Sequence, residues 1–179
     1  SILLCSTADL LASSPQLSII MPRGIHRGVE HELTFVGNRL QDTEEVLFYQ
    51  EGVTVLGIEV VDDKNVKVKV QVSADCDLGE HIAQLRTRSG ISEFRSFFVG
   101  ALPAVAEAEP NGALEEAQAI ENNVTVTGIV TSEDVDLFKV AMGKGERLAV
   151  EVEALRLGTT LFDPYICLLY TSDAADEAI

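Results

Sequence analysis

A strict two-residue alternation between Asn65 and Val72 constrains the fold of this chain more than any other sequence feature. Apolar side chains occupy every second position there and long polar side chains fill the positions between them: Val66, Val68, Val70 and Val72 against Lys67, Lys69 and Gln71. Successive side chains of a β-strand point to opposite faces, so this pattern predicts a strand with one buried and one solvated face.

Similar short apolar or alternating segments recur over residues 15–100, each ended by a turn signal. Besides 65–72, the expected strands cover residues 17–21, 32–36, 46–49, 53–61, 81–88 and 94–99. Helical periodicity is nearly absent, and strands of this length at even spacing are typical of an antiparallel β-sandwich. The Cys-Trp-Cys signature of antibody-type domains is excluded because the chain has no Trp.

The second half of the chain has a different composition. Residues 101–112 are rich in Ala, Pro and Glu and predict a linker, and residues 113–119 predict a short helical stretch. Strand signals resume at residues 124–130, 136–140 and 147–155. We therefore expect an all-β protein with a first sandwich domain over 15–100 and a second domain over 113–166.

Both ends of the sequence look unrelated to the fold. Residues 1–14 contain a short apolar run that ends in a small residue, which is typical of the tail of a secretory signal peptide. The string CLLYTSDAADE at residues 167–177 is similar to a translated sequencing adapter. We expect residues 167–179 to be an adapter-derived artefact and the native sequence to end near Ile166, so that the second domain is incomplete.

The first domain resembles the IPT/TIG family of immunoglobulin-like domains. The matching motifs are Pro15-x-Leu17-x-Ile19, Pro22-Arg23-Gly24, Arg27-Gly28, Leu33-Thr34-Phe35-x-Gly37-Asn38-x-Leu40, Leu78-Gly79-Glu80-His81 and Thr87-x-Ser89-Gly90-Ile91-Ser92 before Phe97-x-Val99. The resemblance implies an immunoglobulin-like β-sandwich that acts as a spacer or binding module.

The second domain resembles the bacterial pre-peptidase C-terminal (PPC) family, small sandwiches related to collagen-binding domains. The matching motifs are Glu107-x-Glu109-Pro110-Asn111, Val126-Thr127-Gly128-x-Val130, Asp134-Val135-Asp136-Leu137-Phe138-x-Val140, Gly145-Glu146-Arg147-Leu148 and Leu161-Phe162-Asp163-Pro164. The resemblance implies a jelly-roll-like β-sandwich, cut short here. The run from residue 155 to 164 also resembles secreted planctomycete-type proteins that join both modules.

Acidic side chains of the second half form the candidate metal site. Glu107, Glu109 and Asn111 alternate, so they share one face if the segment is extended. Asp134 and Asp136 repeat this spacing before an expected strand, and such oxygen ligands suit Ca²⁺.

The PPC resemblance implies calcium ligation by the same five side chains, with Thr127 as a weaker candidate. It also places Gly112 where the family often has Asn or Asp, which removes one ligand. A solvated linker and a turn cap are the alternative interpretations.

Catalytic signals are weak. His26, His31 and His81 are the only histidines, and we expect them to be exposed in turns. No G-x-S-x-G motif is present. Cys76 lies between Asp75 and Asp77, which should raise its pKa and lower its reactivity, so we expect a small buried side chain and no enzyme.

The charge of the chain limits its partners. The formal net charge is −16, with −5 over residues 1–100 and −11 over residues 101–179. This argues against nucleic acid and anionic membranes, because both are polyanions. No apolar run is long enough to span a membrane.

We expect a non-catalytic binding or spacer fragment of a larger secreted, periplasmic or cell-surface bacterial protein. Its partners would be an extracellular protein or polysaccharide and other domains of the same full-length chain. The alternative is an accessory region of a secreted hydrolase or peptidase whose catalytic domain is absent. A lipoprotein anchored through Cys5 is a weaker alternative, because Leu4 stands where a small residue is expected.

Overall fold

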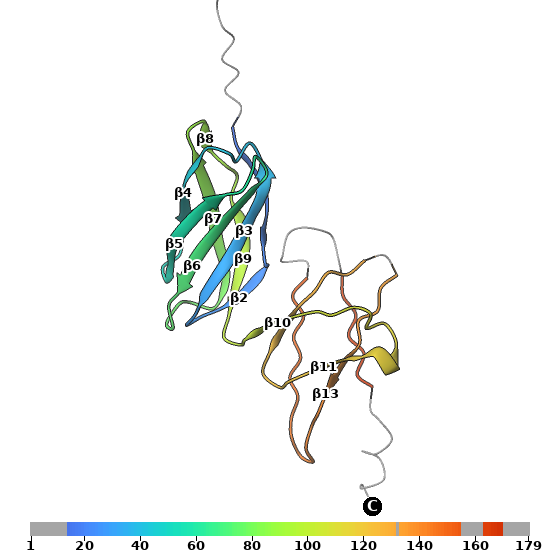
Figure 1. The fold of residues 1–179 in the computed structure, drawn as a ribbon. Coiled ribbons are helices and arrows are strands. Elements are labelled where there is room, and N and C mark those ends of the chain that lie inside the picture. The colour runs from blue at the N-terminus through green and yellow to red at the C-terminus, as the bar shows by residue number, and fades with distance from the viewer. Residues whose placement is uncertain (1–13, 132, 155–162, 170–179) are drawn as a thin grey trace, which may run out of the picture. The chain divides into compact units, whose positions relative to one another are not determined.

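The computed structural model describes residues 14–131, 133–154 and 163–169. Over these residues the only helical element is a single 3₁₀ turn, and the remaining regular structure is β. The chain divides into two compact units, Ser1–Glu146 and Arg147–Ile179. Figure 1 shows a two-layered sandwich in the first part of the chain and shorter strands after it.

One layer of the sandwich is a four-stranded antiparallel sheet, here sheet A. Its strands follow the order β1 (Gln16–Met21), β3 (Glu30–Asn38), β6 (Asn65–Val72) and β5 (Val53–Val60). The boundaries of β6 are those that the alternation predicts. Its four valines are fully buried, while Lys67 and Lys69 lie on the outer face.

The other layer is sheet B, in which β2 (Gly24–His26), β9 (Arg95–Gly100), β7 (Gly79–Thr87) and β4 (Thr43–Phe48) are neighbours in that order. The two-residue strand β8 (Gly90–Ile91) pairs with β7. Strands β1, β3, β6 and β5 in one layer, against β4, β7 and β9 in the other, follow the strand order of the immunoglobulin fold. The predicted all-β, immunoglobulin-like class is confirmed.

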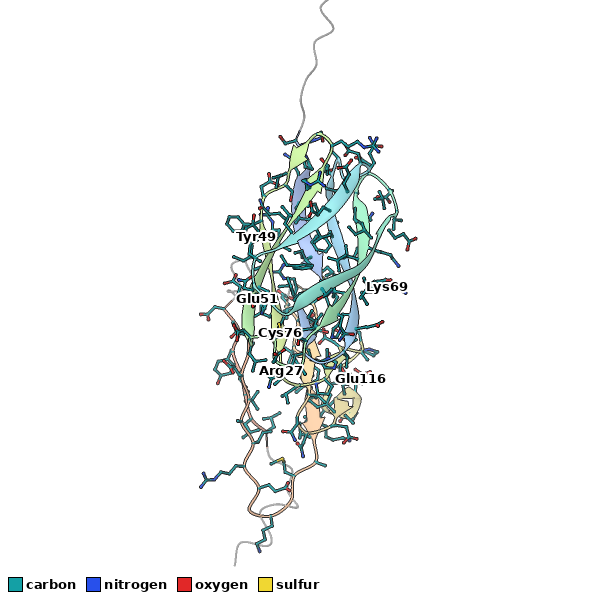
Figure 2. All side chains as sticks on the ribbon, turned by 90° about the vertical axis from the view of Figure 1, so that its left-hand side faces the viewer. Arg27, Tyr49, Glu51, Lys69, Cys76 and Glu116 are labelled. Atoms are coloured by element: carbon teal, nitrogen blue, oxygen red, sulfur yellow. The ribbon has the colours of Figure 1, made fainter. Side chains whose placement is uncertain are left out.

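A single apolar core joins the two sheets. Its largest fully buried apolar side chains are Leu17, Ile20, Leu33, Phe35, Leu40, Leu85 and Phe97, besides the valines of β6. The expectation that Cys76 is a small buried side chain is confirmed. Figure 2 labels Cys76 within the sandwich and Lys69 on its outer side.

The histidines differ from expectation. His81 is buried in β7 with its ring 5.7 Å from that of Phe97, and its Nε2 lies 2.8 Å from the carbonyl oxygen of Asp77. His26 and His31 are half-buried strand residues that pack edge to face, with ring centroids 4.9 Å apart. The exposed-turn prediction was wrong because β2 and the first residues of β3 continue pairing where Pro and Gly suggested only a turn.

After the sandwich, two parallel strand pairs organise residues 104–140. Strand β10 (Ala104–Ala106) pairs with β12 (Thr125–Thr127), and β11 (Gln118–Ile120) pairs with β13 (Phe138–Val140). Residues 104–106, inside the expected linker, thus form backbone hydrogen bonds with the segment that follows.

Two expectations for this half were wrong. The helical stretch expected at 113–119 contains only the 3₁₀ turn Leu114–Glu116. The reason is that Gln118–Ile120 forms strand β11, which pairs with β13. Residues 147–154 form no strand despite their alternation, since no ladder of the described residues includes them. Most of the leader expected at residues 1–14 and most of the adapter-derived tail expected at residues 167–179 lie outside the described residues, which omit 1–13 and 170–179.

Candidate cation site

Glu107 is fixed directly after β10. Its backbone N–H donates to the carbonyl oxygen of Thr127 at 2.9 Å, which continues the pairing of β10 with β12. Its carboxylate Oε2 accepts a 3.0 Å hydrogen bond from the N–H of Ile129. A Cβ atom at Gly128 would lie 2.7 Å from Cδ of Glu107, so glycine leaves room for the carboxylate in its present position.

Asn111 is the only fully buried side chain among the five predicted ligands. Its Nδ2 donates to Oε1 of Glu107 at 3.0 Å, and its backbone N–H donates to Oε2 of Glu109 at 3.0 Å. Its carbonyl oxygen accepts from the N–H of Leu137 at 3.0 Å, which fixes the segment beside the start of β13. The side-chain oxygen Oδ1 is buried and has no hydrogen-bond partner among the described residues.

Asp136 lies just before β13 and contributes the third carboxylate of the cluster. Carboxylate oxygens of Glu107, Glu109 and Asp136 all lie within 4.8 Å of one another. Oδ1 of Asp136 is buried without a hydrogen-bond partner in the described part of the chain. None of the ion pairs between described residues involves these three carboxylates.

The protonation of Asp136 reflects this crowding. Burial, followed by the negative charges of Glu107, Asp134 and Glu109, raises the pKa of Asp136 to about 6. Like charges this close disfavour ionisation of a carboxyl group, whereas a bound cation would favour it.

The structure leaves Asp134, one of the five predicted ligands, and the weaker candidate Thr127 outside the convergent group. Asp134 accepts hydrogen bonds from the N–H and Oγ1 of Thr131 at 3.0 and 3.1 Å, which lowers the pKa of Asp134. It closes a local turn, as the alternative interpretation expected. The hydroxyl of Thr127 lies 3.5 Å from the carbonyl oxygen of Val105, across the β10–β12 pair.

The oxygen donors suit a hard divalent cation. Calcium takes six to eight oxygen ligands from carboxylates, amide or backbone carbonyls and water. Three convergent carboxylates and the free Oδ1 of Asn111 supply part of such a set, and water would complete it. Sequence reasoning missed the contribution of Gly128, although its signal was the Val126-Thr127-Gly128 motif.

The one Cys–His pair in the described residues has the wrong geometry for nucleophilic catalysis. Sγ of Cys76 lies 3.8 Å from Nε2 of His81, and both side chains are buried. Burial, then Asp77 and Asp75, raise the pKa of the thiol. The 2.8 Å contact between Nε2 and the carbonyl oxygen of Asp77 requires a proton on Nε2, so this nitrogen is not a base toward the thiol.

The strand order and core define an immunoglobulin-like β-sandwich protein. Among solved structures, the chain is similar to a titin M10–obscurin-like 1 immunoglobulin complex, at 16% identity and a TM-score of 0.32, over 48% of this chain and 90% of that one. It is also similar to the SrpA adhesin of Streptococcus sanguinis, at 13% identity and a TM-score of 0.32, over 49% of this chain and 57% of that one.

No family model and no curated protein matches the chain. Across the described residues, no helix has the length and apolar character needed to cross a membrane.

Proposed function

We propose that this chain is a non-catalytic binding and spacer region of a secreted, periplasmic or cell-surface bacterial protein. We further propose that it binds calcium at the junction of the linker (101–112) and the second domain (113–166), which together form the second module. The observation that carries the calcium assignment is the convergence of Glu107, Glu109 and Asp136, with the buried Asn111 bonded to Glu107 and its Oδ1 without a partner among the described residues. Its partners would be an extracellular protein or polysaccharide and further domains of the same chain.

Electrostatics supports a cation at this position. Three carboxylates whose oxygens lie within 4.8 Å of one another repel, and buried oxygens without partners carry a desolvation cost of about 1–3 kcal/mol each. A divalent cation would offset both the repulsion and the desolvation cost, because it supplies a positive charge and is coordinated by the unpartnered oxygens. A purely solvated linker does not account for a fully buried Asn111.

Two observations support the finer family assignments. The immunoglobulin strand order is compatible with an IPT/TIG-like first module. Three of the acids carried over from the PPC resemblance lie within one cluster, although they come from segments more than 25 positions apart. The blocked Cys76–His81 pair supports the non-catalytic assignment.

Isothermal titration of the whole chain with calcium chloride tests the proposal. Glu107→Gln and Asp136→Asn each remove a ligand charge while keeping side-chain size, and we expect calcium affinity to fall at least tenfold. Asp134→Asn is the matched control, because Asp134 bonds within its own turn, and it should retain most of the affinity. Absence of calcium binding to the wild-type chain, or equal affinity in all three variants, would contradict the calcium assignment.

A further inference from the structure

Strand β5 forms an open edge of sheet A. Among the described residues, β5 pairs with β6 on one side and no strand pairs with its other side (Figure 1). Val72 of β6 bonds toward β3, since its carbonyl accepts from Gly28 at 3.0 Å and its N–H donates to Val29 at 3.1 Å. Ser73 bonds to Gly52 and Asn65 to Val61, on the β5 side.

These bonds fix which groups of β5 face outward. Residues 66, 68, 70 and 72 of β6 bond toward β3, so their cross-strand partners in β5 are non-hydrogen-bonded pairs. Those partners are Val60, Ile58, Val55 and Val53. Their N–H and C=O groups therefore point to the open edge, where none has a hydrogen-bond partner among the described residues.

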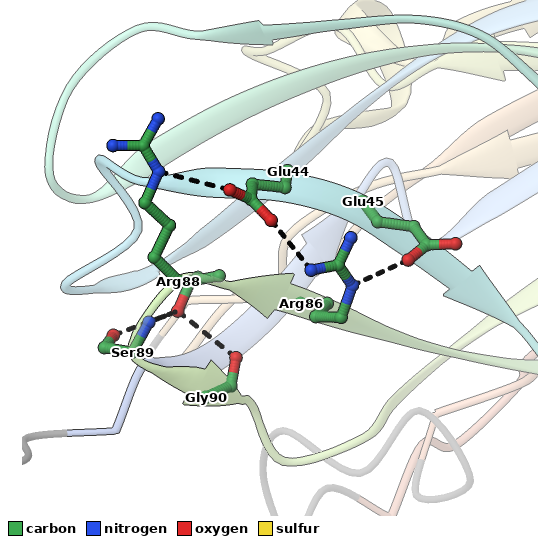
Figure 3. Close-up of polar contacts among 7 residues, drawn as sticks. Glu44, Glu45, Arg86, Arg88, Ser89 and Gly90 are labelled. Carbon is green, nitrogen blue, oxygen red and sulfur yellow. Dashed lines mark hydrogen bonds and ion pairs between the residues drawn. The ribbon is translucent and has the colours of Figure 1, made fainter.

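The edge of β5 carries less charge than the β4 edge of sheet B, although β5 contains a β-bulge between Val55 and Gly57. Its sequence, VTVLGIEV, contains no Pro or Lys, and Glu59 is its only charge. The edge strand of sheet B, β4, carries Glu44 and Glu45, which bind Arg86 and Arg88 in the ion-pair cluster of Figure 3 at 2.7–3.1 Å. A largely apolar edge with unpaired backbone groups is a template for another strand.

We propose that a second copy of this chain pairs with the first through β5, antiparallel and about a two-fold axis. Before the β-bulge between Val55 and Gly57, the backbone groups that point to the open edge belong to odd-numbered residues. After the bulge they belong to even-numbered residues. Consequently, only the register that sets Val53 opposite Val60 and Val55 opposite Ile58 of the second copy aligns all four outward residues. Each such pair would exchange two hydrogen bonds and join both A sheets into one.

The side chains at the bulge fit the same register. Leu56 is 51% exposed, and in this register it lies opposite Gly57 of the second copy. A depression of about 150 Å³ lies over Gly57, lined by Glu32, Gly57, Ile58, Glu59, Lys67 and Lys69, and a Cβ at Gly57 would meet no atom within 4 Å. Leu56 of each copy would fill the depression of the other, which an isologous interface requires.

Charge sets the conditions for association. Glu59 faces Thr54 of the second copy, so no like charges meet within the paired strands. Beyond the strand ends, Glu51 faces Asp62 of the second copy, and this repulsion is screened by salt. Association should therefore strengthen with ionic strength, the opposite of a contact held by ion pairs.

Sedimentation velocity of the whole chain over a range of concentrations, at low and high salt, tests the pairing. We expect a monomer–dimer equilibrium that Leu56→Lys weakens at least tenfold, because two lysines would meet at the axis. Val61→Lys is the matched control: Val61 is also 51% exposed but lies outside the paired strands, and its dimer should persist. A monomer at every concentration, or equal loss in both variants with unchanged circular dichroism, would overturn the proposal.

A cross-linking experiment tests the register separately. In a Cys5→Ser, Cys167→Ser background, Thr54→Cys and Glu59→Cys chains are oxidised alone and mixed. The pair is non-hydrogen-bonded, with Cα atoms about 4.5 Å apart, which a disulfide can span. We expect cross-linked dimers from the mixture and not from either variant alone. Cross-links from single variants, or none from the mixture, would overturn this interface.

Discussion

At Asp136, burial and neighbouring carboxylates act on one carboxyl group, and this has a consequence for stability. Its pKa of about 6 lies above that of the unfolded chain, near 3.8, so the folded state holds an extra proton between these values. The stability that this proton provides is present below about pH 4 and is lost as pH rises through 6.

We therefore predict that, without calcium, the second module melts at a lower temperature at pH 7 than at pH 5. Asp136→Asn should abolish most of this difference, because the side chain no longer titrates, and saturating calcium should do the same by favouring the charged form. Differential scanning calorimetry in a chelator and in calcium measures both effects. An equal pH dependence in wild type and Asp136→Asn would contradict the assignment of the titration to this residue.

The ligands themselves were partly predictable from single residues. Alternation of Glu107 and Glu109 suggested a shared face, and the structure places both carboxylates with that of Asp136. Asp134 has the same spacing to Asp136, yet it bonds to Thr131 three positions away. Sequence spacing cannot decide between a local turn and a distant cluster, because that choice depends on how β12 and β13 bring the segments together.

Among the elements, the paired strands β3 and β6 both place fully buried side chains in the sandwich core. Leu33 of β3 is fully buried opposite Val68, whereas Glu32 next to it lies on the outer face. We predict that Leu33→Ala lowers the free energy of unfolding of the sandwich by about 2–5 kcal/mol, through lost apolar burial and the cavity left behind.

Urea unfolding followed by circular dichroism measures this change, with Glu32→Ala as the control on the solvent face. That variant loses only an exposed ion pair with Lys67, so its midpoint should hardly move. Similar destabilisation in the two variants would show that the inward and outward faces of β3 are not as described.

Elements differed in how far the sequence predicted them. Strand β6 was predicted to the residue, because one face is buried and its alternation is complete. Strands β2 and β8 have three and two residues, too few to show a period. Residues 147–154 alternate but form no strand, since a strand also requires a neighbour with which to pair, and a local pattern does not report this.

For the whole molecule, the uneven charge is consistent with the two functions that we propose, a binding or spacer sandwich and a calcium-binding second module. The sandwich half has a net charge of −5 and is held by an apolar core, whereas the remainder has −11 over fewer residues. A cation that neutralises part of this excess should stabilise the second module without affecting the sandwich core. The candidate ligands all come from residues 107–136, after the last strand of the sandwich.

In the proposed function, calcium binds between Glu107, Glu109 and Asp136. A crystal structure of the chain grown with calcium, with the ion located by its anomalous scattering, tests this most directly. We predict one ion about 2.3–2.6 Å from carboxylate oxygens of all three residues, with Oδ1 of Asn111 as a further ligand. Calcium bound elsewhere, or this cluster free of calcium in the crystal, would contradict calcium binding at this site.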